Sequence, residues 1–288
     1  MRRAVTLCVL ASFLLFTGCV ELMQVYTLNP NGSGKVELDT ITPANQQFGT
    51  DTQPKKPEEV IKEAIQERLD EGKGIEAWSN ITCEMTKEGK IRFRGTAYFS
   101  NINKLNSGDD STGNLRWTKE GDAMLLKMEK ENAEGDDQPE EALTDAQVEE
   151  KLKQEKMQYQ QMKPMMAAMF GGMKVQISAK LPGKIVESNI FTVDGQTATL
   201  TITGKQVIDA MEKINADDKL LRAKIKAGSK GEDDFMFEHI FGKTGPMMAK
   251  VTGATEQLFD YDEEVAKAKA GEEAMFKKLG VTKPGKSE

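Results

Sequence analysis

The chain has 288 residues, enough for one large or two small folded domains. It carries a formal net charge of −7 at pH 7, and only 6% of its residues are aromatic whereas 30% are charged. This acidic balance argues against binding to nucleic acid and against electrostatic docking on anionic lipid head groups, and the scarcity of aromatic residues predicts a modest core.

The N-terminal segment has the layout of an exported bacterial lipoprotein. Arg2 and Arg3 form a positive start, and residues 4–16 are apolar except for one threonine and one serine. This stretch is shorter than the about 20 apolar residues of a membrane-spanning helix. Phe16-Thr17-Gly18-Cys19 resembles a lipobox, so we expect residues 1–18 to be a signal peptide and Cys19 to carry lipid. The alternative is an ordinary signal peptide, with cleavage near Gly18 and an incidental cysteine.

Lipid on Cys19, such as palmitate chains, would hold the protein on the extracytoplasmic side of a cell membrane or an outer membrane. Each buried acyl CH₂ contributes about 0.8 kcal/mol, and two or three chains make the attachment effectively permanent. Val20, in place of an aspartate after the cysteine, favours the outer membrane under a sorting rule that depends on the host. Loss of the two arginines of the signal would change the formal charge from −7 to −9.

Cysteine usage agrees with this interpretation. Cys8 leaves with the signal and Cys19 is acylated, which leaves Cys83 alone in the mature chain, so no intramolecular disulfide can form. Cys83 alternates with Ile81 and Met85 in a strand pattern. We expect it to be a small buried apolar residue rather than a nucleophile or metal ligand.

Residues 19–130 are predicted to form the first part of an α+β domain. Alternating apolar residues over 20–28 and 36–40 flank the turn residues 29–34, which indicates a β-hairpin. Pro57 starts an amphipathic helix whose apolar stripe includes Leu69 and which ends at Gly72.

Two further hairpins follow that helix. The first joins residues 81–85 to 91–99, and the second joins 115–117 to 124–128. Their alternation is typical of antiparallel sheet with one covered face, and the low aromatic content favours a single layer of sheet under helices over a sandwich.

Residues 131–173 are expected to be an insert that consists of an acidic linker and a Met-rich helix. A capping box at Thr144 opens the helix. Lys163-Pro164 is expected to interrupt it, and Gly171-Gly172 to end it.

The second part of the α+β domain is predicted over residues 174–227, followed by a mainly helical, peripheral tail over 228–288. Residues 185–191 are expected to pair with 197–203 around Asp194-Gly195, and 207–214 to form a helix. Alternation returns over 221–227, and helices are expected over 233–241 and 262–279.

The predicted fold class is therefore α+β, with a curved antiparallel sheet, packed amphipathic helices and a helical C-terminal tail. Three segments in this order resemble the LppM-like domain of bacterial envelope lipoproteins: Leu28-Asn29-Pro30-Asn31-Gly32-Ser33-Gly34-Lys35-Val36, Gly95-Thr96-Ala97-Tyr98-Phe99-Ser100-Asn101-Ile102 and Leu181-Pro182-Gly183-Lys184-Ile185-Val186-Glu187-Ser188-Asn189. The resemblance covers roughly residues 20–130 and 174–215. It implies a curved sheet with a packed helix and a role in binding amphiphiles, and it carries over no catalytic residues.

Six methionines within residues 157–173 form the most unusual feature of the composition. Four of them follow helical spacing: Met162, Met166, Met169 and Met173. We interpret them as core or interfacial packing, with a flap over a lipid pocket or against the bilayer as a refinement of that reading. Thioethers also bind Cu(I), but no Cys or His accompanies them.

No motif predicts catalysis, a cofactor or a metal site. Gly242-Lys243-Thr244 is similar to the end of a phosphate-binding loop, but Phe237 stands where that loop requires glycine. His239 has no Ser or Cys partner in a recognisable motif, and the acidic pairs lack calcium-loop spacing.

We therefore expect a non-catalytic, membrane-anchored envelope protein that binds a lipid or another amphiphile. The alternative is a structural or assembly lipoprotein that acts through a protein partner in the envelope. A cavity between the sheet and the helix of Leu69 or of Met166 would favour the first hypothesis, and a closed core the second.

Overall fold

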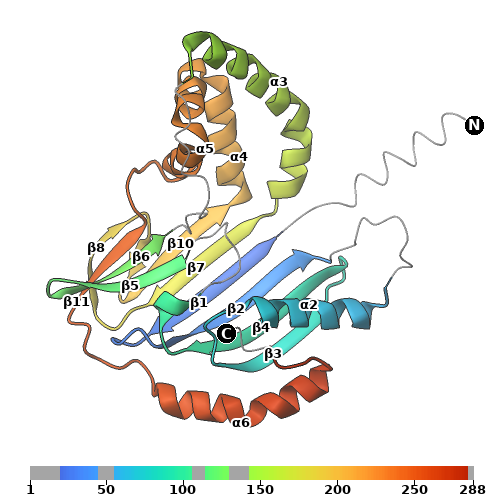
Figure 1. Ribbon diagram of the computed structural model, residues 1–288, viewed down its shortest axis with the longest axis vertical. Helices are drawn as coiled ribbons and strands as arrows, with labels where there is room; N and C mark the ends of the chain where they lie inside the picture. Colours follow the sequence, from blue (N-terminus) through green and yellow to red (C-terminus); the bar gives the residue numbers. More distant parts are fainter. Residues whose placement is uncertain (1–19, 45–54, 106–113, 130–142, 285–288) are drawn as a thin grey trace, which may run out of the picture. The chain divides into compact units, whose positions relative to one another are not determined.

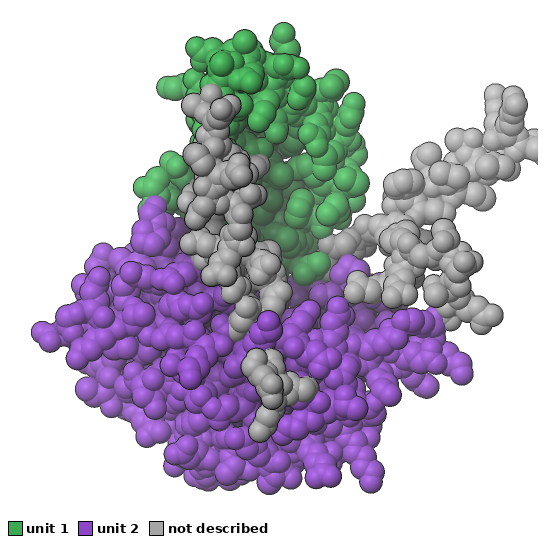
Figure 2. Space-filling model, in the orientation of Figure 1, with its two compact units in different colours: residues 1–20, 134–174, 202–244 green, residues 21–133, 175–201, 245–288 purple. Residues whose placement is uncertain are grey.

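The computed structural model describes residues 20–44, 55–105, 114–129 and 143–284. The lipidation site Cys19, the signal peptide and most of the acidic linker lie outside these ranges. The described chain has the predicted α+β composition, with two sheets and packed helices (Figure 1). Its described residues divide into two compact units: one contains residues 20, 143–174 and 202–244, and the other contains residues 21–44, 55–105, 114–129, 175–201 and 245–284 (Figure 2).

The larger unit contains a seven-stranded sheet in the order β3-β4-β2-β1-β7-β10-β9. Its strands are β1 (Glu21–Leu28), β2 (Gly34–Pro43), β3 (Ala77–Met85), β4 (Lys90–Phe99), β7 (Lys174–Lys180), β9 (Thr192–Asp194) and β10 (Thr197–Thr203). The pairs β1–β2, β2–β4, β3–β4 and β9–β10 are antiparallel, so the first two predicted hairpins are confirmed.

The turn between β1 and β2 fastens several segments together. Gly32 has φ 84°, a conformation that glycine adopts at little cost. Asn29 is 1% exposed, and its side chain accepts a hydrogen bond from the Leu258 amide at 2.9 Å. The same side chain donates to Ser33 Oγ and to the Phe259 carbonyl, each at 3.3 Å. The turn therefore holds the loop that precedes the C-terminal helix.

Other bonds attach the same turn to the 3₁₀ helix η1 (Ile102–Lys104) and to strand β5 (Asn114–Glu120). The Trp117 indole donates to the Pro30 carbonyl at 3.2 Å, and the Ile102 amide donates to the Gly32 carbonyl at 2.9 Å. The Asn103 side chain accepts a hydrogen bond from the Trp117 amide at 2.7 Å and donates one to the Trp117 carbonyl at 2.9 Å. The first two segments that resemble the LppM-like family thus form a shared hydrogen-bonded junction.

Gly34 is the first residue of β2, and its backbone packs closely against the ring of Phe99. A Cβ atom at this position would lie 2.5 Å from the Thr27 carbonyl oxygen and 2.7 Å from Phe99 Cζ. Phe99 is fully buried. The close approach of backbone to ring therefore requires glycine.

A second sheet, not anticipated from the sequence, has the order β5-β6-β11-β8. The hairpin of β5 and β6 (Ala123–Glu129) is the third one predicted. Strand β11 (Met248–Thr252) pairs with β6 and with β8 (Lys184–Asn189). The predicted pairing of residues 185–191 with 197–203 is wrong, because β8 joins this second sheet and β10 pairs instead with β9.

Helix α2 (Pro57–Glu71) begins at Pro57 and ends before Gly72 as predicted, and it buries Ile65 and Leu69. Helix α6 (Tyr261–Leu279) matches the predicted C-terminal helix, although it is packed more closely than a peripheral tail. Its residues Val265 and Ala268 contact Ala77 and Tyr98 of the large sheet.

A buried carboxylate also links α6 to β3. Glu272 is 5% exposed, accepts a hydrogen bond from the Trp78 amide at 3.1 Å and pairs with Lys283 at 2.9 Å. Both bonds satisfy a charge that would otherwise be costly to bury.

The face of the large sheet on which α6 packs also carries charged residues. Asp39 of β2 accepts two hydrogen bonds from Arg92, at 2.6 and 2.9 Å, and one from Arg94 at 3.2 Å. The hydrogen bond from Arg92 is the main cause that holds the pKa of Asp39 below its usual value, against the opposing effect of partial burial.

The smaller unit is a helical cluster of α3 (Asp145–Phe170), α4 (Gly204–Ala216) and α5 (Asp218–Phe241). Its core consists of Val148, Leu152, Ile214, Leu221 and Ile225. The capping box at Thr144 and the end of α3 at Gly171 are confirmed.

Two sequence predictions about this unit are wrong. Pro164 lies inside α3, which continues to Phe170 and is drawn as an arc (Figure 1). Residues 221–227, expected to alternate as a strand, belong to helix α5, where Leu221 and Ile225 lie one turn apart on its buried side. His239 is also in α5, where its ring stacks near Phe235 and Nδ1 lies 2.8 Å from the Phe235 carbonyl.

Candidate functional site: an apolar pocket between the sheet and helix α2

A pocket lies in the larger unit, between the face of the β1–β2 hairpin and the C-terminal end of α2. Its floor consists of Gln24, Tyr26, Val36 and Leu38. Gln24 pairs with Leu38 and Tyr26 with Val36 in the antiparallel register. Because alternate residues of a strand share a face, these four side chains form one continuous patch.

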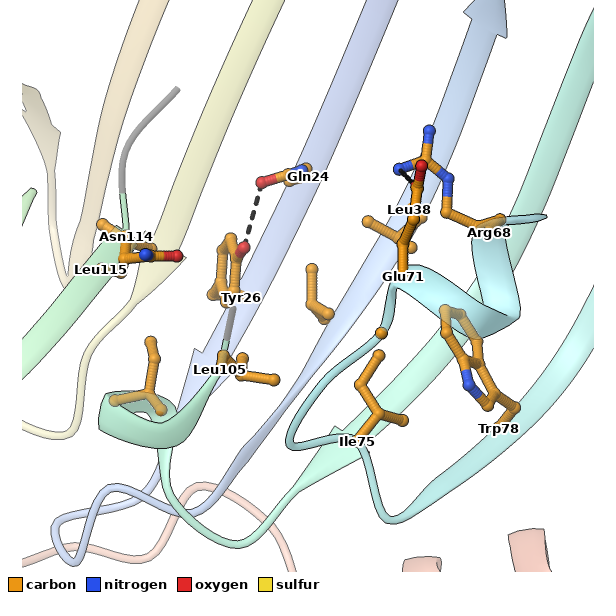
Figure 3. Close-up of a pocket in the computed structure, with 13 residues that line it drawn as sticks. Gln24, Tyr26, Leu38, Arg68, Glu71, Ile75, Trp78, Leu105, Asn114 and Leu115 are labelled. Atoms are coloured by element: carbon orange, nitrogen blue, oxygen red, sulfur yellow. Dashed lines mark hydrogen bonds and ion pairs between the residues drawn. The ribbon is translucent and has the colours of Figure 1, made fainter. Parts of the chain in front are cut away.

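Two walls face each other across this floor (Figure 3). On one side, α2 and the segment after it contribute Arg68, Glu71, Gly72 and Ile75, with Trp78 of β3 beneath them. The opposite wall is formed by η1 and the start of β5, through Ile102, Leu105, Asn114 and Leu115. The walls are thus mainly apolar.

A polar pair lies within the floor. The Tyr26 hydroxyl donates to Gln24 Oε1 at 3.0 Å, and the two side chains are 7% and 8% exposed. Burial raises the pKa of the Tyr26 phenol far above its ordinary value, so the group is uncharged at neutral pH. The floor therefore offers a hydrogen-bonding group without a buried charge.

The rim combines apolar and charged side chains. Leu38, Ile75 and Leu105 are half-buried. Arg68 and Glu71 lie one turn apart on α2 and form an ion pair of 3.4 Å, with side chains 29% and 40% exposed. Such an exposed pair adds little to stability, but it places one cation and one anion beside an apolar opening.

The pocket is narrow. The volume of its cavity is about 60 Å³. Drug-sized ligands fill pockets of about 300–1,000 Å³. The cavity of this conformation is much smaller than that range, so it fits a segment of a thin, flexible chain better than a broad ring system.

Gly72 keeps one wall open. A Cβ atom at this position would lie 2.6 Å from Ile75 Cδ1 and 3.3 Å from Trp78 Cζ2. Gly72 has φ −74°, so its backbone would accept another residue. The constraint is space within the pocket rather than backbone conformation.

The methionines selected from the sequence are not part of this pocket. Met162, Met166, Met169 and Met173 belong to the helical unit. Met166 is buried, Met162 and Met173 are half-buried, and Met169 is 50% exposed. The structure thus separates them into one packing residue and a set of partly or largely exposed ones.

Cys83 lies on β3, and its side chain is half-buried. Burial raises the pKa of its thiol to about 11. Within the described ranges, no group of three or more His, Cys, Asp or Glu residues is arranged to hold a metal ion.

Sequence reasoning missed the pocket residues because they come from distant segments. One signal was available, since Gln24 interrupts an otherwise apolar face of the first strand. A polar residue in such a row indicates either a buried hydrogen bond or a binding surface.

Comparison with known proteins gives few matches. No family model matches the chain, and no curated protein matches it in sequence. The fold is similar to the NMR structure of the folded domain of LppM from Mycobacterium tuberculosis, with a TM-score of 0.35 and 9% identity over 82% of this chain and 90% of that one. That domain carries the family name suggested by the three sequence motifs, and membership of this chain in the family stays a prediction.

Within the part of the chain that the structure describes, no helix has both the length and the apolar composition that a membrane span requires.

Proposed function

We propose that the protein is a lipid-anchored envelope protein that holds the hydrocarbon chain of an amphiphile in the pocket between the β1–β2 hairpin and α2. The observation that carries the proposal is a narrow, mainly apolar pocket whose floor contains an uncharged polar pair, Gln24 and Tyr26. A hydrocarbon chain gains about 25 cal/mol for each Å² of apolar surface that it removes from water in such a site.

The rim suggests how the polar end of the ligand would lie. Arg68 and Glu71 offer one positive and one negative group beside the opening. A head group with a hydroxyl or phosphate could exchange its water for these side chains, while the chain passes over Leu38 toward Tyr26.

The pocket can be tested by substitution on two neighbouring residues of β2. Leu38 lies in the pocket floor, whereas Glu37 is exposed on the opposite face of the same strand. Leu38→Phe should reduce the lipid that co-purifies with residues 20–288, as counted by native mass spectrometry, and Glu37→Phe should leave it unchanged. Equal lipid content in both variants, or none in the unsubstituted protein, would count against the pocket.

The anchor needs its own measurement. Intact-mass analysis of protein extracted from membranes should show a mature chain that begins at Cys19 and carries diacylglyceryl and acyl groups. Cys19→Ala should abolish this added mass. An unmodified N-terminal residue in the extracted protein contradicts the anchor and leaves the pocket proposal intact.

A protein-binding role is the second candidate, and one observation favours it. Strand β8 is an edge of the four-stranded sheet, and its Val186 is 51% exposed. Exposed edge strands can pair with an extended segment of a partner. Photo-crosslinking from position 186 in intact envelopes should give a discrete protein adduct if this role holds, and no adduct if it does not.

A further inference from the structure

An exposed apolar surface lies on the second half of α3, in the helical unit. We define the methionine face as Met157, Met165, Ala168 and Met169, all of which are exposed. The three methionines are 61%, 51% and 50% exposed. Solitary exposed apolar residues are common, but these four follow one another along a single side of one helix.

The buried residues of α3 lie on a different side of the helix from the methionine face. Val148, Leu152 and Met166 are its buried residues, and at 100° per residue they lie on the side opposite the methionine face. The buried side packs in the helical unit, with Val148 and Leu152 in its core. The exposed methionines are therefore not needed to complete that core.

Charge changes sharply along the same helix. The first half contains Asp145, Glu149, Glu150 and Glu155, whereas residues 156–174 contain no Asp or Glu. The only charged residues of that second stretch are Lys156, Lys163 and Lys174. Lys156 pairs with Asp218 of α5 and Lys163 with Glu212 of α4, so this half of α3 presents little net negative charge for anionic lipids to repel.

The segment that follows α3 is hydrogen-bonded to Val20, the first residue that the structure describes. The Lys174 amide donates a hydrogen bond to the Val20 carbonyl at 2.9 Å, and the Met173 amide donates to the Phe170 carbonyl at 2.8 Å. Val20 directly follows Cys19 and the apolar residues 4–16. The methionine face is thus on the helix that ends at Phe170, four residues before the residue that is bonded to Val20.

We propose that the methionine face of α3 lies in the head-group region of the bilayer, as a second membrane contact next to the N-terminal anchor. Interfacial helices bury an apolar side by about 5–10 Å at this depth and keep their polar side outward. Unbranched, flexible methionine side chains suit an irregular lipid surface. The inference rests on the proposed function for the anchor alone and is independent of the pocket.

Depth-dependent fluorescence on the full-length protein tests this inference. Single cysteines replace Met165 or Met169 in a chain with Cys8→Ala and Cys83→Ala, and each is labelled with an environment-sensitive dye. Glu150→Cys is the matched control, since it is exposed on the same helix but lies among the acidic residues. The labelled proteins are reconstituted into vesicles of phosphatidylethanolamine and phosphatidylglycerol and purified by flotation.

We expect blue-shifted emission at positions 165 and 169, and strong quenching there by lipids with a nitroxide high on the acyl chain, with neither effect at position 150. Floated protein with water-like emission at 165 and 169 overturns the inference and leaves the anchor standing. Blue-shifted emission that the lipid nitroxide does not quench also overturns it, because the face is then covered by protein, such as a second copy. Failure to float contradicts both the anchor and the inference.

Discussion

Asn29→Ala should weaken the junction that joins the first hairpin to the C-terminal part of the chain. The buried side chain of Asn29 accepts from the Leu258 amide at 2.9 Å and donates two longer bonds of 3.3 Å, to Ser33 and Phe259. A typical bond contributes about 1 kcal/mol net, and a buried partner left unsatisfied costs about 1–3 kcal/mol more. With the two long bonds counted at the low end, the free energy of unfolding should fall by about 2–4 kcal/mol.

Urea unfolding followed by tryptophan fluorescence is the suitable assay. Both tryptophans, Trp78 and Trp117, belong to the larger unit, so the signal reports on the unit that contains Asn29. With a denaturant slope of about 2–3 kcal/mol/M, the predicted loss lowers the midpoint by roughly 1 M. Hydrogen exchange should also accelerate at the Leu258 amide.

Asn31→Ala provides the control. Asn31 is exposed, and its side chain accepts from Ser33 within the same turn, at 2.8 and 3.0 Å. This substitution should lower stability by about 1 kcal/mol and leave exchange at Leu258 unchanged. An unchanged midpoint in Asn29→Ala, or equal exchange at Leu258 in both variants, would refute the proposed junction.

Three further predictions concern stability and reactivity. Gly34→Ala should destabilise the fold by about 3 kcal/mol or more, because the added Cβ would lie 2.5 Å from a carbonyl oxygen. Gly271→Ala should instead stabilise the fold by about 0.5–1 kcal/mol, because the space around this position of α6 is open. Thermal unfolding of the two variants checks both predictions. The pKa of Asp39 is lowered, chiefly by the hydrogen bond from Arg92, so Asp39 stabilises the fold above its unfolded pKa of about 3.9 and less as the pH falls. Asp39→Asn should therefore cost about 1–3 kcal/mol at pH 7, and urea midpoints should show this difference shrinking below pH 4 or so. Because the pKa of Cys83 is raised to about 11, its reaction with a thiol reagent at pH 8 should be roughly 100-fold slower in the folded protein than in urea.

Local features of the fold could be predicted because their causes are local. The turn residues 29–34 lie between alternating strands, and Thr144 begins α3 with a capping box. Each pattern fixes hydrogen bonds within a few residues, so it needs no knowledge of distant partners.

The predictions of secondary structure are wrong where the same residue pattern fits two kinds of element. Leu221 and Ile225 fit alternation along a strand, but they also lie one helical turn apart, and their packing in the helical core decided in favour of α5. The sequence predicts an interruption of the helix at Pro164, yet the carbonyl that this proline leaves without a partner belongs to the exposed Gln160, where water can bind it.

Long-range pairing could not be predicted either. Strand β8 pairs with β11, which is some sixty residues later in the chain and was not recognised as a strand. Only five residues form β11, although Ala249 and Val251 are fully buried. Such a short segment carries little pattern of its own.

The pocket could not be predicted for the same reason, since its residues come from segments that are distant in the sequence. The alternation of the first hairpin places Gln24, Tyr26, Val36 and Leu38 on one face, but it does not say what covers them. The answer depends on the packing of α2 and η1 over that face, which brings Ile75 and Leu105 to the rim. The sequence did identify the helix of Leu69 as one of two candidates for this cover.

Quenching of Trp78 tests the proposed pocket most directly, because this residue lines the pocket and is 2% exposed. In a full-length protein with Trp117→Phe, Trp78 is the single source of tryptophan fluorescence. Titration with stearic acid brominated along its chain should quench Trp78 saturably, and Leu38→Phe should weaken this effect while Glu37→Phe preserves it. An emission that does not change with the brominated chain, in protein shown to be folded by circular dichroism, would contradict amphiphile binding in this pocket.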